Sequence, residues 1–231
     1  MPLALIEANY LSRIRTAAVT AVATDLLAPQ HVSCLAHFGA GKISEDLIKA
    51  ILKVRPSINR VLLVRKHKEY GAPTWLNQID KTIPVELADA ADALREAEII
   101  TTATSSINPV IPPRAKMSNV RHLNLIGSNH LKRREIHKTL ASKCLPPKGY
   151  LVVDDTKQAE IEAGDFFELS KSGVLNWKRI PTLAQLLVDD TERIKAQKAN
   201  LTVFKSLGLG LMDLAVAEGV LRRLGVLPSQ Q

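Results

Sequence analysis

Residues 39–44 carry the clearest chemical pattern in the chain, one suited to binding a phosphate-containing ligand. They read Gly-Ala-Gly-Lys-Ile-Ser and lie between an apolar run, Val32–Phe38, and an amphipathic segment that opens near Ile43. In a turn from strand to helix, Gly39 permits the tight bend, and Gly41 lets a pyrophosphate approach because it lacks a Cβ. The small Ser44 lets the helix pack against the strand, and the helix N-terminus offers free N–H groups to phosphates. The pattern predicts a dinucleotide-binding turn.

Glycines in a turn from strand to helix also occur for purely geometric reasons, and this alternative stays open for the motif alone. If the turn binds a dinucleotide, we expect its first five residues to contact the cofactor, with Lys42 facing phosphate or solvent rather than substrate. The expected contacts in this turn are Gly39, Ala40, Gly41, Lys42 and Ile43.

The end of the next expected strand indicates which dinucleotide is bound. Domains that bind NAD typically place Asp or Glu there, about 20 residues after the glycines, to hold the ribose 2′-hydroxyl. Here the strand Arg60–Val64 is followed by Arg65, Lys66, His67 and Lys68. Arg65 and Lys66 offer cations that suit a 2′-phosphate. The sequence therefore predicts that NADP(H) is preferred, with NAD(H) as the second candidate; a solvated basic loop is the alternative.

Composition excludes several other classes of protein. The chain has 231 residues, 46% of them hydrophobic and 23% charged, which is typical of a globular protein. Its net charge of +8 suits anionic ligands, but the basic residues are scattered and aromatic residues make up only 4%, so we expect no nucleic-acid partner. Cys34 and Cys144 lie far apart without metal-ligand spacing, which favours a reducing compartment. We expect no membrane span, no metal and a cytoplasmic location.

The alternation of apolar runs and amphipathic segments predicts an α/β fold with a doubly wound parallel sheet of the Rossmann type. Continuous apolar runs such as Arg60–Val64 are typical of parallel strands covered on both faces. The expected strands are 2–6, 32–38, 60–64, 98–103, 123–126 and 151–153. The expected helices are 9–28, 43–55, 88–97, a short one after 182, and a packed C-terminal helix within 208–224.

Five short segments, in this order, make the chain resemble the ornithine cyclodeaminase/μ-crystallin family over nearly its whole length. Each segment is weakly specific alone, but the five together are specific. The segments are Arg15-Thr16-Ala17-Ala18, Phe38-Gly39-Ala40-Gly41, Thr101-Thr102-Ala103-Thr104, Leu125-Ile126-Gly127-Ser128-Asn129 followed by Arg133-Arg134-Glu135, and Thr202-Val203-Phe204-Lys205-Ser206-Leu207-Gly208.

The resemblance implies a Rossmann domain joined to a second domain that binds substrate and dimerises. Members of the family use NAD(P) to oxidise or reduce the α-carbon of amino or imino acids. For this chain it implies a small amino or imino acid as substrate and a homodimer or higher association. It also implies cofactor contacts from Arg15 and Thr16 to phosphates, and from Thr102, Thr104, Gly127, Asn129, Arg133 and Ser206.

Five of these residues also have a plainer interpretation. Arg15 alone could be a solvated helix charge, and Gly127 a turn glycine. Thr102 and Thr104 could fill a strand, and Ser206, expected to cap the last helix toward the nicotinamide, could be only an N-cap.

Asn129 departs from the family pattern in a way that bears on chemistry. The family's cyclodeaminases have an aspartate two residues after the glycine that corresponds to Gly127, where it acts in proton transfer. An amide cannot exchange a proton as a carboxylate does at neutral pH. Ornithine cyclodeamination is therefore disfavoured, the catalytic residues stay unassigned, and a reductase or dehydrogenase is favoured, because the cofactor itself carries the hydride.

The first residues depart from the family as well. Members usually have a substantial segment before the residues that match Pro2–Ile6, which carries the basic residues for the substrate carboxylate and much of the dimerisation domain. We therefore expect a short member, with residues 29–182 as the Rossmann domain and residues 1–28 and 183–231 as the remnant of the second domain. The alternative to an oxidoreductase is a non-catalytic NADP(H)-binding remnant of the family.

Overall fold

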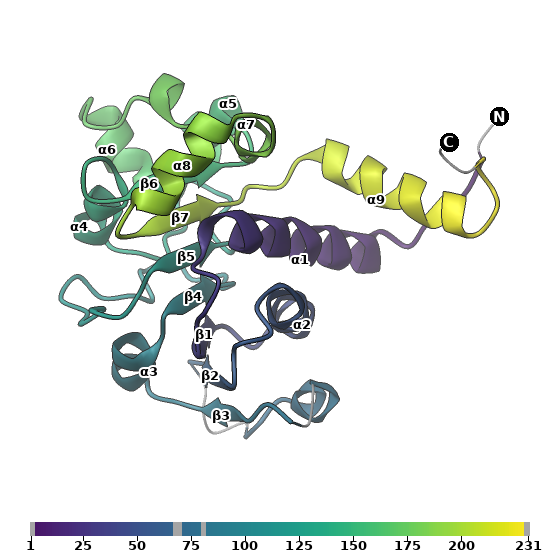
Figure 1. Cartoon of the computed structure of the whole chain (residues 1–231), viewed down its shortest axis with the longest axis horizontal. Coiled ribbons are helices and arrows are strands. Elements are labelled where there is room, and N and C mark those ends of the chain that lie inside the picture. The colour runs from purple at the N-terminus through teal and green to yellow at the C-terminus, as the bar shows by residue number, and fades with distance from the viewer. Residues whose placement is uncertain (1–2, 67–70, 80–81, 229–231) are drawn as a thin grey trace.

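A seven-stranded, entirely parallel sheet forms the centre of the chain (Figure 1). The computed structural model describes residues 3–66, 71–79 and 82–228. The strand order is β3-β2-β1-β4-β5-β7-β6. The strands are β1 Cys34–Phe38, β2 Arg60–Val64, β3 Val85–Leu87, β4 Ile99–Thr102, β5 His122–Leu125, β6 Tyr150–Val153 and β7 Thr202–Lys205.

Helices cover both faces of the sheet, which confirms the predicted doubly wound α/β fold of the Rossmann type. Helices α1, α2, α7 and α8 pack on one face, and α3, α4 and α5 pack on the other. The helices are α1 Ala8–Leu27, α2 Ser44–Val54, α3 Ala90–Glu96, α4 Lys138–Ala141, α5 Thr156–Glu162, α6 Phe167–Lys171, α7 Leu183–Val188, α8 Asp190–Lys198 and α9 Gly210–Arg223.

Two strands were not predicted, for different reasons. Strand β3 has only three residues, and its outer two positions are half-buried or exposed, so it lacks an apolar run. Strand β7 is buried throughout but ends in Lys205, a charged residue that interrupts the apolar pattern. It pairs with both β5 and β6. Thus residues from both ranges assigned to the second domain pack with the sheet, and the division into domains stays a prediction.

The predicted strand at residues 2–6 is wrong within the described residues. Leu3–Ile6 form no strand, and Leu5 is fully exposed. The Glu7 carboxylate instead caps α1 by accepting hydrogen bonds from the backbone N–H groups of Asn9 and Tyr10, at 3.0 and 2.6 Å. An apolar run forms a strand only beside another strand, and no described strand is available here.

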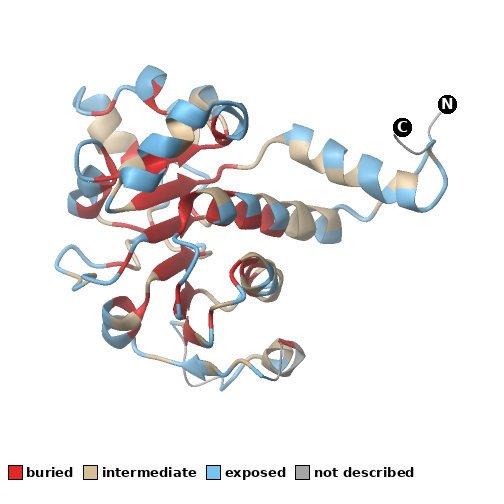
Figure 2. Cartoon of the chain, in the orientation of Figure 1, coloured by how far each residue is buried: buried red, intermediate tan, exposed pale blue. Residues whose placement is uncertain are grey.

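The C-terminal helix exists, but the prediction that it is packed is wrong. None of the residues of α9 is buried, and Leu211 and Leu214 are 72% and 68% exposed. Figure 2 shows α9 in the colours of exposed and half-buried residues, projecting away from the sheet beside α1. Apolar residues at helical spacing predict a helix, but they do not identify the surface that covers it.

A buried polar seam joins α1 to the middle of the sheet. Thr24 of α1 accepts a hydrogen bond from the Asn124 side chain of β5 at 2.9 Å. The Asn124 amide oxygen lies 3.0 Å from His122 Nε2, and His122 Nδ1 lies 2.9 Å from the Thr202 hydroxyl. Thr202 in turn donates to the carbonyl of Leu27 at 2.9 Å. These directional bonds fix α1 across β5 and β7.

Arg55, directly after α2, fixes the other end of α1. Its side chain is fully buried and its guanidinium forms an ion pair with Asp25 at 2.7 Å. It also donates to five backbone carbonyls, three of them at the end of α1. Carbonyls at a helix C-terminus lack intrahelical donors and carry partial negative charge, so a cation there is favourable. The five carbonyls belong to Thr24, Asp25, Ala28, Pro29 and Val54.

We predict that Arg55→Met lowers the free energy of unfolding by about 3 kcal/mol or more, because it leaves several buried carbonyls without donors. Arg55→Lys should lose a substantial part of the same free energy, since an ammonium group cannot reproduce the planar fork of the guanidinium. Urea denaturation measures both. Arg60→Lys is the matched control: Arg60 pairs with Glu86 and Glu96 at the surface, and little change is expected. Equal stability of all three variants would contradict this role of Arg55.

Two buried histidines make the fold sensitive to acid. Burial lowers the pKa of His37 to about 3 and is also the main cause that lowers the pKa of His122 to about 4. Neither ring nitrogen of His37 has a hydrogen-bond partner among the described residues. Because the folded chain binds these protons less tightly than the unfolded chain, the stabilisation is complete above about pH 6.5. It is lost as the pH falls through about 4 for His122 and about 3 for His37.

We predict that His37→Leu reduces this acid sensitivity, because leucine fills a similar volume and cannot be protonated. The loss of unfolding free energy between pH 6.5 and pH 5 should shrink by on the order of 2 kcal/mol. Urea denaturation across this pH range measures the change. An unaltered dependence on pH would mean that His37 does not take up a proton on unfolding.

Candidate functional site

The segments that follow four strands enclose a cleft of about 300 Å³ at the carboxyl edge of the sheet. These strands are β1, β4, β5 and β7. The cleft lies at the switch in strand order, where β2 and β3 follow on one side of β1 and β4 and β5 on the other. Parallel α/β sheets bind their ligands at this position. It is lined by Ser12, Arg15, Thr16, Ile43, Ala103, Thr104, Ser105, Ile126, Gly127, Asn129, Arg133, Ser206, Leu207 and Gly208.

The structure brings eight of the residues proposed from the sequence into the lining of this cleft. They are Arg15, Thr16, Ile43, Thr104, Gly127, Asn129, Arg133 and Ser206. Six further lining residues were not proposed as contacts, although four of them belong to the five family segments and the other two, Ser12 and Ser105, lie within three positions of a proposed residue. They are Ser12, Ala103, Ser105, Ile126, Leu207 and Gly208.

Seven proposed residues do not line the cleft. Gly39, Ala40, Gly41 and Lys42 form the turn that leads to Ile43, and Thr102 is buried as the last residue of β4. Arg65 and Lys66 follow β2, where the Arg65 guanidinium donates to the carbonyl of Gly71. His67 and Lys68 lie outside the described residues.

The glycine turn has the geometry expected of a phosphate-binding turn. Gly39 has φ +121°, and a Cβ added there would lie 2.5 Å from the carbonyl oxygen of Ala103. Only glycine fits this position. A Cβ added at Gly41 would meet nothing within 4 Å, so the space above this residue is open.

Helix α2 begins directly after the turn without a side-chain cap. Its N-cap residue, Ile43, makes no capping hydrogen bond, and the Ser44 hydroxyl is buried without a partner among the described residues. The acidic residues of the first turn are neutralised, because Asp46 pairs with Arg13 at 2.7 Å and Glu45 with Lys49 at 2.6 Å. The N–H of Ser44 donates to the carbonyl of Gly41 at 3.1 Å, and the N–H groups that follow it in the first turn have no side-chain cap and are available to an anion.

Arg15 lies on the side of the cleft formed by α1 and the segment after β7. Its Nε is 3.1 Å from a carboxylate oxygen of Asp213, on α9. Gly208 adopts φ +86°, and a Cβ there would lie 2.4 Å from Nη1 of Arg15, so glycine makes room for the guanidinium. The hydroxyl of Thr16 donates to the carbonyl of Ser12 at 2.7 Å.

Ser206 does not cap the last helix, which corrects the prediction made for it. Helix α9 begins at Gly210, with Leu209 as its uncapped N-cap residue. The Ser206 hydroxyl instead donates to Asp154 Oδ2 at 3.0 Å, and the same oxygen accepts the backbone N–H groups of Leu207 and Gly208 at 2.7 and 2.8 Å. Asp154 was missed because its partners come from another strand, although a carboxylate directly after a buried strand is a signal.

The lining contains two guanidinium groups and no carboxylate. Arg133 lies exposed after β5, and Asn129 stands four residues before it, also exposed to the cleft. The hydroxyl of Ser128 holds this loop by donating to the carbonyl of Arg133 at 2.5 Å. An amide and two cations suit an anionic ligand.

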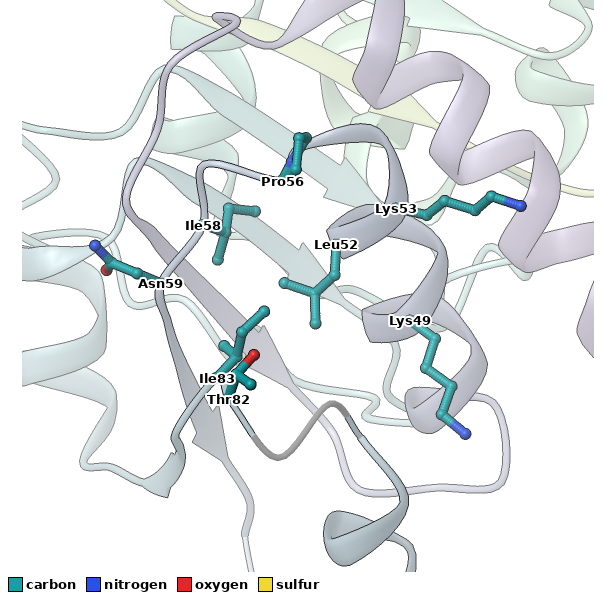
Figure 3. A pocket seen from close by; sticks show the side chains of 8 residues that line it. All are labelled: Lys49, Leu52, Lys53, Pro56, Ile58, Asn59, Thr82 and Ile83. Atoms are coloured by element: carbon teal, nitrogen blue, oxygen red, sulfur yellow. The ribbon is translucent and has the colours of Figure 1, made fainter.

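A larger cleft of about 520 Å³ lies near the opposite end of the strands (Figure 3). It is bounded by α2 and by the residues that precede β2 and β3. Leu52, Ile58 and Ile83 lie between α2 and the sheet, and Lys49 and Lys53 point away from them. We do not assign the site there, since ligands of parallel α/β sheets bind at the carboxyl edge. In the described part of the chain, no three His, Cys, Asp or Glu residues are placed to hold a metal ion, and none of the helices has the length and apolar character that a membrane span requires.

A parallel sheet with this strand order, a glycine turn after β1 and a cleft at the switch in strand order define a Rossmann-type dinucleotide-binding fold. Comparison with known families agrees with the five sequence segments. The chain belongs to the ornithine cyclodeaminase/mu-crystallin family, whose model matches residues 1–225.

Three proteins illustrate how similar this chain is to known proteins in sequence and structure. The chain is 29% identical to a Δ1-pyrroline-2-carboxylate reductase of Bacillus cereus, over 94% of this chain and 65% of that protein. It is 30% identical to a probable ornithine cyclodeaminase of Bordetella pertussis Tohama I, with TM-score 0.79 over 95% of this chain and 68% of that one. A Δ1-pyrroline-2-carboxylate reductase of Thermococcus litoralis, solved in complex with NADH and L-proline, is 25% identical, with TM-score 0.77 over 95% and 67%. The chain thus spans about two thirds of the length of these relatives.

Proposed function

We propose that this chain belongs to an NAD(P)-dependent oxidoreductase that acts at the α-carbon of a small amino or imino acid. The observation that carries the proposal is the cleft at the carboxyl edge, lined by Arg15 and Arg133 and by no carboxylate. The relative from Thermococcus litoralis, which is named with NADH and L-proline, supports the same class of ligands.

The residues present fit a dinucleotide. The open space at Gly41 and the start of α2, which has no side-chain cap, form a cradle for a pyrophosphate. We propose that Gly39, Ala40, Gly41, Lys42 and Ile43 hold it there. Thr104, Gly127 and Ser206 would then contact the rest of the cofactor from the ends of β4, β5 and β7.

The bound nicotinamide would supply the hydride acceptor or donor for the reaction. Arg15 would bind an anionic group of the cofactor or the carboxylate of the amino acid, because a guanidinium forks onto phosphate and carboxylate oxygens alike. Asn129 would orient the substrate by hydrogen bonding but cannot transfer a proton as a carboxylate does. The proposal is therefore oxidation or reduction at the α-carbon rather than cyclisation of ornithine.

A homodimer or higher association is also proposed. Leu211, Leu214 and Leu224 expose 72%, 68% and 70% of their surface on or directly after α9, and association would remove this apolar surface from water. Light scattering of the purified chain measures the state directly.

Gly41→Ala tests the dinucleotide site. Because a Cβ at Gly41 meets no protein atom, we predict an unchanged melting temperature, whereas the added methyl group should raise the dissociation constants of NADH and NADPH at least about tenfold. Fluorescence titration measures binding. Gly39→Ala is the matched control and should instead lose on the order of 1–3 kcal/mol of stability, because of its φ and the Ala103 carbonyl. Unchanged binding by a folded Gly41→Ala variant would argue against the site.

Arg65→Asp tests the choice between the two cofactors. We propose that NADPH is preferred, since Arg65 and Lys66 follow β2, where an acidic residue would hold the ribose of NAD. A charge-assisted contact to the 2′-phosphate contributes about 1.5–3 kcal/mol, so a preference of roughly tenfold or more is predicted, and Arg65→Asp should remove or invert it. Arg114→Asp, the same change in an exposed loop outside the cleft, should leave it unaltered. Equal dissociation constants for NADPH and NADH in the unsubstituted protein would contradict the preference.

A further inference from the structure

A buried carboxylate lies behind the floor of the cleft and holds two of its walls together. Glu135 is fully buried in the loop after β5. Its Oε1 accepts the backbone N–H and the hydroxyl of Thr104, at 2.8 and 3.1 Å, and its Oε2 accepts the backbone N–H of Gly127 at 2.7 Å. Thr104 follows β4 and Gly127 follows β5, and both line the cleft. One side chain therefore sets the distance between the two segments.

Gly127 is glycine because of this arrangement. A Cβ added there would lie 2.1 Å from the Thr104 carbonyl oxygen and 2.5 Å from Oε1 of Glu135. Any larger residue would separate the β4 and β5 segments or displace the carboxylate. The backbone of the cleft floor and the Glu135 side chain thus depend on one another.

Two more buried charges complete the cluster. Asp165 Oδ1 accepts the backbone N–H groups of Glu135 and Ile136 at 2.6 and 3.1 Å. Lys205 Nζ lies 3.5 Å from Asp165 Oδ2 and donates to the carbonyl of Leu125 at 3.3 Å. Burial raises the pKa of Glu135, the Lys205 charge opposes this shift and the Asp165 charge adds to it. Burying three charged groups is costly, which favours a role for them beyond filling space.

We propose that Glu135 is a positioning residue that shapes the part of the cleft that receives the nicotinamide half of the cofactor. The inference rests on the proposed function, because it presupposes a dinucleotide. In a Rossmann-type sheet the pyrophosphate lies at the turn after β1 and the adenosine ribose at the end of β2. The other half of the molecule then extends toward β4 and β5, whose ends Glu135 joins. The adenosine half depends on Gly41 and Arg65 instead.

Glu135→Gln keeps the length of the side chain but removes one acceptor, so its amide NH₂ must face one of the two backbone N–H donors. We expect isothermal titration calorimetry to give an NADPH affinity roughly tenfold or more below that of the unsubstituted protein. The affinity for 2′,5′-ADP, which carries only the adenosine half, should stay within about twofold. Equal weakening of both ligands would mean a merely structural role and would overturn the proposal, as would unchanged NADPH binding by the folded variant.

A measurement on the unsubstituted protein keeps the test decisive if Glu135→Gln does not fold. In the unsubstituted protein, the amides of Thr104 and Gly127 should exchange hydrogen more slowly with NADPH but not with 2′,5′-ADP. Equal protection by both ligands, or by neither, overturns the inference. Failure of the unsubstituted protein to bind NADPH and NADH would instead refute the proposed function.

Discussion

The buried guanidinium of Arg55 fixes α1, and the candidate site depends on where α1 lies. Arg55 satisfies the last carbonyls of α1 while standing directly after α2, so it determines how these two helices meet. The bond from Asn124 to Thr24 then sets α1 across β5. These two constraints place the N-terminal half of α1 at the carboxyl edge of the sheet. Arg15 therefore lines the cleft although α1 precedes β1 in the sequence.

The walls of the cleft are backbone segments, and buried carboxylates hold them from behind. Glu135 ties the segments after β4 and β5, and Asp154 ties the three residues after β7. Because both carboxylates are buried and accept these hydrogen bonds from behind, they hold the walls in place without lining the cleft themselves. The lining itself therefore carries the cations Arg15 and Arg133, and the acidic group paired with Arg15 is the half-exposed Asp213 of α9, which does not line the cleft.

The sequence predicts the parts of the fold that depend on local pattern. The strand Arg60–Val64 is found at its expected bounds, and the glycine turn lies where its spacing requires. Leu3–Ile6 and α9 were misjudged because an apolar pattern does not say which surface will cover it. The burial of Glu135 and Lys205 was not predicted, since most of the groups that make it tolerable, Thr104 for Glu135 and Asp165 and Leu125 for Lys205, are 30 or more positions away.

The contrast between local pattern and distant partners also explains why the motif residues were predicted more readily than the residues that support them. Gly39, Gly127 and Gly208 can be recognised in the sequence because two segments that approach closely require a glycine at the point of contact. The groups that approach these three glycines are the Ala103 carbonyl, the Thr104 backbone together with the Glu135 carboxylate, and the Arg15 guanidinium, all backbone atoms or common residue types. A glycine in a family motif therefore identifies a contact, and only the three-dimensional structure identifies its partner.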